Sequence, residues 1–221
     1  MGAMTRQAQV EHSPHVAERA PMLYEAMPQI AYSQIRSRGT IGGSIAHADP
    51  SAELVAASVA LSGRFRLRRR AEERWVPADE FFVGLFTTVL EPDELLVEVA
   101  LPPMPARGGW AFLEVARRHH DFALVGVAAV VALDGAGACQ QTRLVYFSVG
   151  DGPVEAHTAA QLLKGQTPTP EAIREAVEAA SEADLDPTSD INASTEYRRH
   201  LAKVLGQRAL AQAFDRARGG D

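Results

Sequence analysis

The chain has 221 residues, 46% of them hydrophobic, and carries a formal net charge of −6. It is long enough to bury a core as one large domain or two small ones, and its acidic balance argues against nucleic acid as a partner, because phosphate binding needs a concentrated basic surface. One cysteine, Cys139, excludes an internal disulfide framework and a multi-cysteine zinc or iron–sulfur site.

The composition also bears on the cellular compartment. A single cysteine favours a reducing environment, and no apolar run approaches the roughly 20 residues that span a bilayer. The first residues, MGAMTRQAQVEHSPHV, lack the apolar segment of a signal peptide. The sequence therefore predicts a cytoplasmic protein without a membrane span.

The first half of the chain begins with a region of helical periodicity. Apolar residues recur at helical spacing between Ser13 and Met27, where Ser13 can cap a helix and Pro14 suits its first turn. A second segment, AELVAASVAL at residues 52–61, is apolar enough to form a buried helix that the following Ser-Gly pair would end. We therefore expect two helices, one on each side of a glycine-containing stretch.

From Arg64 onward the hydrophobic period changes to two. In RFRLRRR the arginines alternate with Phe65 and Leu67, which is the pattern of a half-exposed strand, and residues 75–76 are its expected return partner. The arginines could bind an acidic partner, but a solvated strand face explains them without one. Residues 80–86, EFFVGLF, then predict a short helical segment, and ELLVEVALP predicts a strand that the next prolines end.

A proline- and glycine-rich run, PPMPARGG, predicts a division into two domains, residues 1–103 and 110–221, with residues 104–109 as the linker. Beyond it, WAFLEVAR, ALVGVAAVVALD and TRLVYFSVG predict three strands. Two helices follow, from about Pro170 to Ala183 and from Glu196 to Ala217. Three strands followed by helices make a small α+β layer.

The stretch RSRGTIGGSIAHADPSAEL, Arg36 to Leu54, contains two adjacent residues without side chains, Gly42 and Gly43. They lie between a strand-like segment and a turn. Without Cβ atoms a ligand can approach this backbone closely, and successive N–H groups can hold a phosphate oxygen. Thr40 and Ser44 add hydroxyl groups. The alternative is a tight turn or bulge that needs positive φ and binds nothing, and spacing alone leaves both interpretations open.

The wider pattern resembles a known family. Four blocks occur in the family's order and cover nearly the whole chain from Arg36 onward: RxRGTIGGSIAHADPxAEL, FFVGLFTTVLEPDELLVEVALP, ARRHHDFALVGVAAVVAL and STEYRRHLAKVLGQRAL. Together they resemble the FAD-binding subunit of molybdenum hydroxylases, namely the medium subunit of carbon monoxide dehydrogenase and the FAD-binding subunit of xanthine dehydrogenase.

The resemblance implies a fold and an oxidoreductase function. The fold is α+β: the second subdomain of a PCMH-type (vanillyl-alcohol-oxidase-like) FAD-binding domain, followed by a C-terminal domain in which a three-stranded antiparallel sheet packs with helices. The function is electron transfer. Molybdopterin on a large subunit and 2Fe–2S clusters on a small subunit deliver electrons to FAD on this chain, which passes them to an external acceptor, within a dimer of heterotrimers.

The resemblance also places cofactor contacts residue by residue. In relatives the glycine motif lies against the FAD pyrophosphate, a carboxylate that corresponds to Glu53 lies near the flavin, and an apolar or aromatic contact falls at Ile30. Asp49 is a second acidic candidate, although a turn-forming role suits it as well. The implied FAD contacts are therefore Ile30, Thr40, Ile41, Gly42, Gly43, Ser44, Asp49 and Glu53, and no residue of this chain is expected to act as an acid, base or nucleophile.

One departure from the family qualifies this expectation. Relatives carry an earlier Ala-Gly-Gly-x-Ser motif on a preceding subdomain that supplies the other wall of the FAD site, and the sequence here contains no such motif. Residues 2–6 resemble the strand and turn that follow that subdomain. The alternative function is therefore a truncated, cofactor-free assembly module that retains only subunit docking.

A histidine pair attracts a further functional interpretation. His119, His120 and Asp121 could be drawn as a metal cluster, but adjacent side chains on a strand or turn point in different directions, and no third ligand has suitable spacing. We therefore expect a polar turn or strand end that approaches the flavin or a partner, and no metal site.

Overall fold

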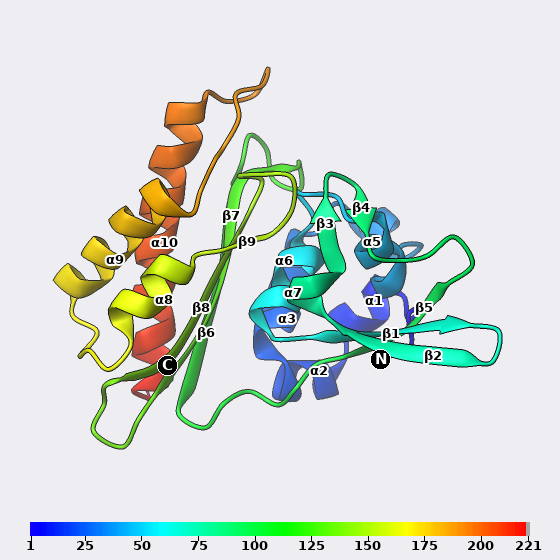
Figure 1. Cartoon of the computed structure of the whole chain (residues 1–221), viewed down its shortest axis with the longest axis horizontal. Coiled ribbons are helices and arrows are strands. Elements are labelled where there is room, and N and C mark those ends of the chain that lie inside the picture. The colour runs from blue at the N-terminus through cyan, green and yellow to red at the C-terminus, as the bar shows by residue number, and fades with distance from the viewer. Residues whose placement is uncertain (220–221) are drawn as a thin grey trace.

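The computed structural model describes residues 1–219, and Figure 1 shows an antiparallel sheet that stands between two groups of helices. The sheet has the order β6-β7-β8-β9, formed by β6 (Gly108–Ala116), β7 (Ala123–Leu133), β8 (Cys139–Phe147) and β9 (Val154–Glu155). Three strands were predicted, and the fourth, β9, is missed because two residues carry no period. The predicted α+β class is confirmed.

Strand β7 explains the arrangement of the whole molecule. All eleven of its residues are buried, so both faces of the sheet are covered, as the unbroken apolar sequence ALVGVAAVVAL requires. Phe112 of β6 and Phe147 of β8 pack into the core of the N-terminal half, whereas Ala111 and Tyr146, their neighbours along the same strands, pack into the core beneath the C-terminal helices. The two halves of the chain therefore share one sheet.

The C-terminal helices cover one face of this sheet. They are α8 (His157–Leu163), α9 (Pro170–Ala183) and α10 (Thr195–Ala217). The bounds of α9 agree with the prediction, and α10 begins one residue earlier than predicted, where the Ser194 hydroxyl accepts a hydrogen bond from the backbone N–H of Tyr197. The Tyr146 hydroxyl donates to the carbonyl oxygen of Ala202 at 3.2 Å, which ties β8 to α10.

The N-terminal half covers the other face, mostly with short helices (Figure 1). These are α1 (Gln7–Glu11), α2 (Pro14–Arg19), α3 (Pro21–Ala26), the 3₁₀ turn η1 (Met27–Gln29), α4 (Ser33–Arg36), α5 (Ile41–His47) and α6 (Glu53–Ala60). The single helix predicted between Ser13 and Met27 is wrong. Pro21 lacks an N–H and disfavours helical backbone at Ala20, which adopts φ −141° and separates α2 from α3.

A small sheet of order β2-β1-β5 completes this half, built from β1 (Arg64–Arg69), β2 (Glu72–Pro77) and β5 (Leu95–Ala100). The predicted alternation of β1 is confirmed, since Phe65 and Leu67 are fully buried. The predicted helix over 80–86 is wrong beyond α7 (Ala78–Phe81): Phe82 turns extended and begins β3 (Phe82–Gly84), which pairs with β4 (Thr87–Thr88). Aromatic and β-branched residues favour this extended backbone.

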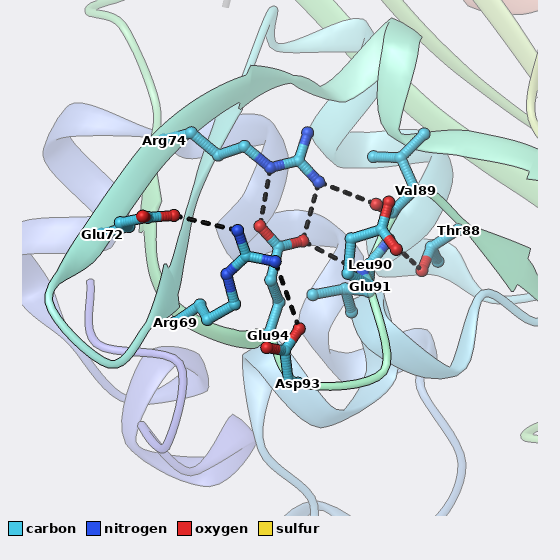
Figure 2. A network of polar contacts seen from close by, with 9 residues as sticks. All are labelled: Arg69, Glu72, Arg74, Thr88, Val89, Leu90, Glu91, Asp93 and Glu94. Carbon is cyan, nitrogen blue, oxygen red and sulfur yellow. Dashed lines mark hydrogen bonds and ion pairs between the residues drawn. The ribbon is translucent and has the colours of Figure 1, made fainter.

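The arginines of this sheet pair with carboxylates of the chain itself. Figure 2 shows Arg74 of β2 donating from Nε and Nη2 to Glu94 at 2.8 and 2.7 Å, and from Nη2 to the carbonyl oxygen of Val89. These hydrogen bonds lower the pKa of Glu94 to about 2. Arg69 lies beside Glu72 and Asp93. The network fastens the β4–β5 connection to the β1–β2 hairpin, which accounts for these two arginines without an external partner.

The predicted linker at residues 104–109 joins β5 to β6, and its last two residues already belong to β6. No helix between residues 1 and 219 combines the length and the apolar character needed to cross a membrane.

Candidate functional site

A cavity of about 740 Å³ lies between the N-terminal helices and the turn that joins β6 to β7. Six of the eight predicted contact residues line it: Ile30, Thr40, Gly43, Ser44, Asp49 and Glu53. These residues come from separate turns and helices, so the fold brings them together. The volume falls within the range of small-molecule sites, roughly 300–1,000 Å³.

The glycine motif does not form the tight turn that was one of its two interpretations. Helix α5 begins at Ile41, and Thr40 precedes it as the cap, with its Oγ1 accepting a hydrogen bond from the backbone N–H of Gly43 at 3.1 Å. Both glycines lie in the first helical turn, and neither has positive φ. With seven residues, this helix is too short for its hydrophobic period to be recognised in the sequence.

The two glycines have different surroundings. Gly42 is buried and donates its N–H to the carbonyl oxygen of Ala3 at 2.8 Å, and a Cβ atom on it would lie 2.4 Å from the Cβ of Ala3. Gly43 is exposed on the cavity, where a Cβ atom would lie 2.7 Å from Oγ1 of Thr40. Gly42, with buried Ile41, therefore packs behind the cavity, and Gly43 is the glycine whose backbone is open to the cavity.

Ile30 and Ala31 belong to an apolar wall that Arg36 holds in place. The buried guanidinium of Arg36 donates to the carbonyl oxygens of Ile30 and Ala31 at 2.9 and 2.6 Å, and to both carboxylate oxygens of Glu11 at 2.7 Å. The hydrogen bonds from Arg36 lower the pKa of Glu11. The sequence alone does not reveal this support of the cavity wall by Arg36, because its partners are backbone carbonyls and a carboxylate 25 residues away in the chain.

Two acidic residues of the motif lie in the cavity wall. Asp49 accepts a hydrogen bond from the backbone N–H of Ser51 at 2.8 Å, so it forms the expected turn as well as lining the cavity. Glu53 is the first residue of α6, and burial raises its pKa to about 7, with the charge of Asp49 adding to the effect. Burial and the charge of Glu53 raise the pKa of Glu114, on β6, to about 8.

The turn between β6 and β7 supplies residues that were not among the predicted contacts. His120, Asp121 and Phe122 line the cavity, and the ring of His120 packs against that of Tyr32 at 5.0 Å between centroids. The block ARRHHDF had signalled this turn as a segment that approaches the flavin or a partner. Among residues 1–219, no group of three His, Cys, Asp or Glu side chains is arranged to hold a metal ion.

Two family models match the chain. One, described as the FAD binding domain in molybdopterin dehydrogenase, matches residues 1–104, and the other, described as the CO dehydrogenase flavoprotein C-terminal domain, matches residues 110–213.

Individual relatives agree with these models. The 6-hydroxypseudooxynicotine dehydrogenase complex subunit alpha of Paenarthrobacter nicotinovorans is 38% identical over 218 residues, which are 99% of this chain and 73% of the relative. The carbon monoxide dehydrogenase medium chain of Hydrogenophaga pseudoflava is 35% identical over 216 residues, 98% of this chain and 75% of the relative.

Solved structures extend the agreement to the fold. A structure of carbon monoxide dehydrogenase from Hydrogenophaga pseudoflava superimposes with a TM-score of 0.92 at 37% identity, over 97% of this chain and 74% of that one. The resemblance found in the sequence is confirmed. The chain belongs to the family of FAD-binding medium subunits of molybdenum hydroxylases, which are oxidoreductases.

Proposed function

We propose that this chain is the FAD-binding electron-transfer subunit of a molybdenum hydroxylase. In this proposal it accepts electrons from the 2Fe–2S clusters of a partner subunit and passes them to an external acceptor. The observation that carries the proposal is the convergence of the motif residues on one cavity, in a chain whose family is defined by FAD binding. When bound, FAD supplies the electron-carrying chemistry, and the protein supplies binding, orientation and electrostatics.

The residues of the cavity fit such a cofactor. Gly43 leaves its backbone open where a Cβ atom would strike the capping hydroxyl of Thr40. Arg6 and Arg38 lie in the wall of the same cavity, where their charge suits phosphate oxygens. Ile30, with other apolar residues of the wall, offers a surface for a flat aromatic ring.

We assign roles on this basis. Thr40, Gly43 and Ser44 face the pyrophosphate, with Ile41 and Gly42 as the packing behind them. Ile30 contacts the ring system, and Glu53 and Asp49 meet polar groups of the flavin or of the chain attached to it. The cavity volume supports this assignment. So does the combination of the exposed Gly43 backbone, the hydroxyl groups of Thr40 and Ser44, and the carboxyl groups of Asp49 and Glu53.

The partners follow from the same proposal. Relatives are named as medium chains and as subunits of dehydrogenase complexes, and the single cysteine here leaves iron–sulfur ligation to another chain. We therefore propose a large molybdenum-binding subunit and a small iron–sulfur subunit as partners, in a cytoplasmic dimer of heterotrimers. Residues 1–103 form the FAD-binding part and 110–221 the C-terminal part, joined by 104–109.

A titration of the purified chain with FAD, followed by visible absorbance and flavin fluorescence, tests the proposal. We expect saturation at one FAD per chain. The alternative is a cofactor-free assembly module that retains only subunit docking, and the chain spans 74% of the carbon monoxide dehydrogenase chain it matches. Failure to bind FAD, together with complex formation with the partner subunits, would establish that module instead.

Replacing Glu53 with alanine tests its assigned role. We expect the Kd for FAD to rise about tenfold, the effect of losing one good polar contact, with the melting temperature nearly unchanged. The control is Glu171→Ala, because Glu171 is also a first-turn glutamate, on α9 across the sheet, and is exposed. If Glu53→Ala and Glu171→Ala bind FAD equally well, Glu53 has no part in the site.

A further inference from the structure

Gln7 places a polar side chain at a buried position of the N-terminal half. It is the first residue of α1, and it shares the buried side of this helix with Val10, three positions on, which packs into the core of that half. Only 5% of Gln7 is exposed. An apolar side chain of the same length would serve the packing equally well, so the fold does not account for the amide.

The amide of Gln7 also lacks a partner in the chain. Its Oε1 atom is buried and makes no hydrogen bond within the described residues 1–219. Leaving a buried polar atom unpaired costs stability, and a ligand or a water molecule is what supplies the partner when the protein does not. Oε1 is an acceptor, so the missing partner is a group that donates a hydrogen bond, such as a hydroxyl group.

This amide belongs to the wall of the cavity that the glycine motif lines. Gln7 and Gly39 both line that cavity. The backbone N–H of Gln7 donates to the carbonyl oxygen of Gly39 at 2.9 Å, and a β-bridge joins the residues beside them, Arg6 and Thr40. These contacts hold Gln7 next to the cap of α5, where we place the pyrophosphate of FAD.

Gly39 provides the space that the amide occupies. A Cβ atom on Gly39 would lie 2.6 Å from Oε1 and 2.9 Å from Cδ of Gln7. The φ angle of Gly39 is not positive, so the backbone conformation does not require glycine there. The absence of a side chain at Gly39 is therefore explained by the close approach of the Gln7 amide.

We propose that Gln7 is a further binding residue of the cavity, whose amide hydrogen-bonds to a hydroxyl group in a sugar-derived part of FAD. The proposal rests on the FAD-binding function proposed above. The amide oxygen accepts the hydroxyl proton, and the amide nitrogen can donate to a neighbouring oxygen, so one side chain serves two adjacent hydroxyl groups. FAD carries such groups on its ribityl chain and on its ribose, on either side of the pyrophosphate.

Replacing Gln7 with methionine tests the amide, because methionine is of similar length and has no amide group. We expect the Kd for FAD to rise about tenfold, the effect of one lost hydrogen bond. The melting temperature without FAD should not fall, because the substitution removes a buried polar atom that has no partner. The control is Gln161→Met, at an exposed position on α8 across the sheet, which should alter neither quantity.

Two smaller probes locate the hydroxyl group. Riboflavin carries the ribityl chain without a phosphate, and ADP carries the ribose without the flavin. If Gln7→Met weakens the binding of riboflavin alone, the contact is to the ribityl chain, and if it weakens the binding of ADP alone, the contact is to the ribose. Equal weakening of both probes would overturn a direct contact with one sugar-derived part.

The contact between Gln7 and Gly39 gives a second test. In Gly39→Ala the added methyl group must displace the amide, so we expect FAD to bind about tenfold more weakly. In a chain that already carries Gln7→Ala, the same substitution should have no further effect, because no amide remains to be displaced. Independent, additive effects of the two substitutions on the Kd would contradict the proposal.

The outcomes separate this proposal from the proposed function. If the wild-type chain and Gln7→Met bind FAD equally well, the role of Gln7 is overturned and the proposed function stands. A melting temperature of Gln7→Met that falls by several degrees without FAD would show that the amide serves the fold, and would also overturn that role. If the wild-type chain does not bind FAD, the proposed function and the role of Gln7 fall together.

Discussion

The Gly43→Val chain is expected to remain folded and to bind FAD at least about 100-fold more weakly than the wild type. A Cβ atom at Gly43 lies 2.7 Å from Oγ1 of Thr40, so the hydroxyl must give up its hydrogen bond to the backbone N–H of residue 43. Losing a helix cap costs about 1 kcal/mol, which the fold tolerates. The branched side chain then occupies the place that we propose for the phosphates of FAD.

Gly42→Ala provides the matched comparison, because it adds only a methyl group next door. That methyl group meets the Cβ atom and the backbone of Ala3, so we expect it to lower the melting temperature and not to act directly on the ligand. Titration with FAD and thermal unfolding of both variants separate the two effects. If Gly43→Val binds FAD with wild-type affinity, the start of α5 is not part of the site.

Replacing Arg36 with methionine should have the largest effect on stability. The substitution leaves the half-buried carboxylate of Glu11 without its partner and the carbonyl oxygens of Ile30 and Ala31 without a donor. Removing one member of a buried ion pair costs about 3–5 kcal/mol. Urea unfolding measures the loss, and Arg19→Met, at an exposed position at the end of α2, is the control.

The pH dependence of stability gives this prediction a second readout. Arg36 lowers the pKa of Glu11 in the folded chain, so the pair stabilises the fold above the ordinary pKa of glutamate, and this contribution is lost as the pH falls through the lowered value. In Arg36→Met this part of the acid-induced loss should disappear. A variant within about 0.5 kcal/mol of the wild type at pH 7 would contradict a structural role for the pair.

The elements that the sequence predicts well are mostly those whose hydrophobic pattern continues over many residues. Strand β7, the alternating β1, and helices α9 and α10 are each specified by their own residues, because one face or both faces of each element are buried throughout. The errors occur where a single residue or a distant contact decides. Pro21 separates α2 from α3, although the periodicity of the sequence predicts one continuous helix there. The two-residue strand β9 is defined by its pairing with the edge of β8.

The site divides in the same way. Gly43, Ser44 and Glu53 were predicted because a motif of known relatives carries them, and the fold places them on one cavity. Arg36 was missed, since its importance comes from buried contacts that only the folded chain creates. Burial of a polar group is a tertiary property, and a pattern of hydrophobic and polar residues does not reveal it.

The sheet that both halves of the chain share has a consequence for how the protein is assembled. Strands β6, β7 and β8 contribute side chains to both hydrophobic cores, one on each face of the sheet. Separating the two halves of the chain would therefore uncover one face of the sheet and expose a continuous apolar surface to water. We therefore expect that neither half folds when it is produced alone. The segment that carries the glycine motif and the segment that carries the C-terminal helices should fold as a single unit.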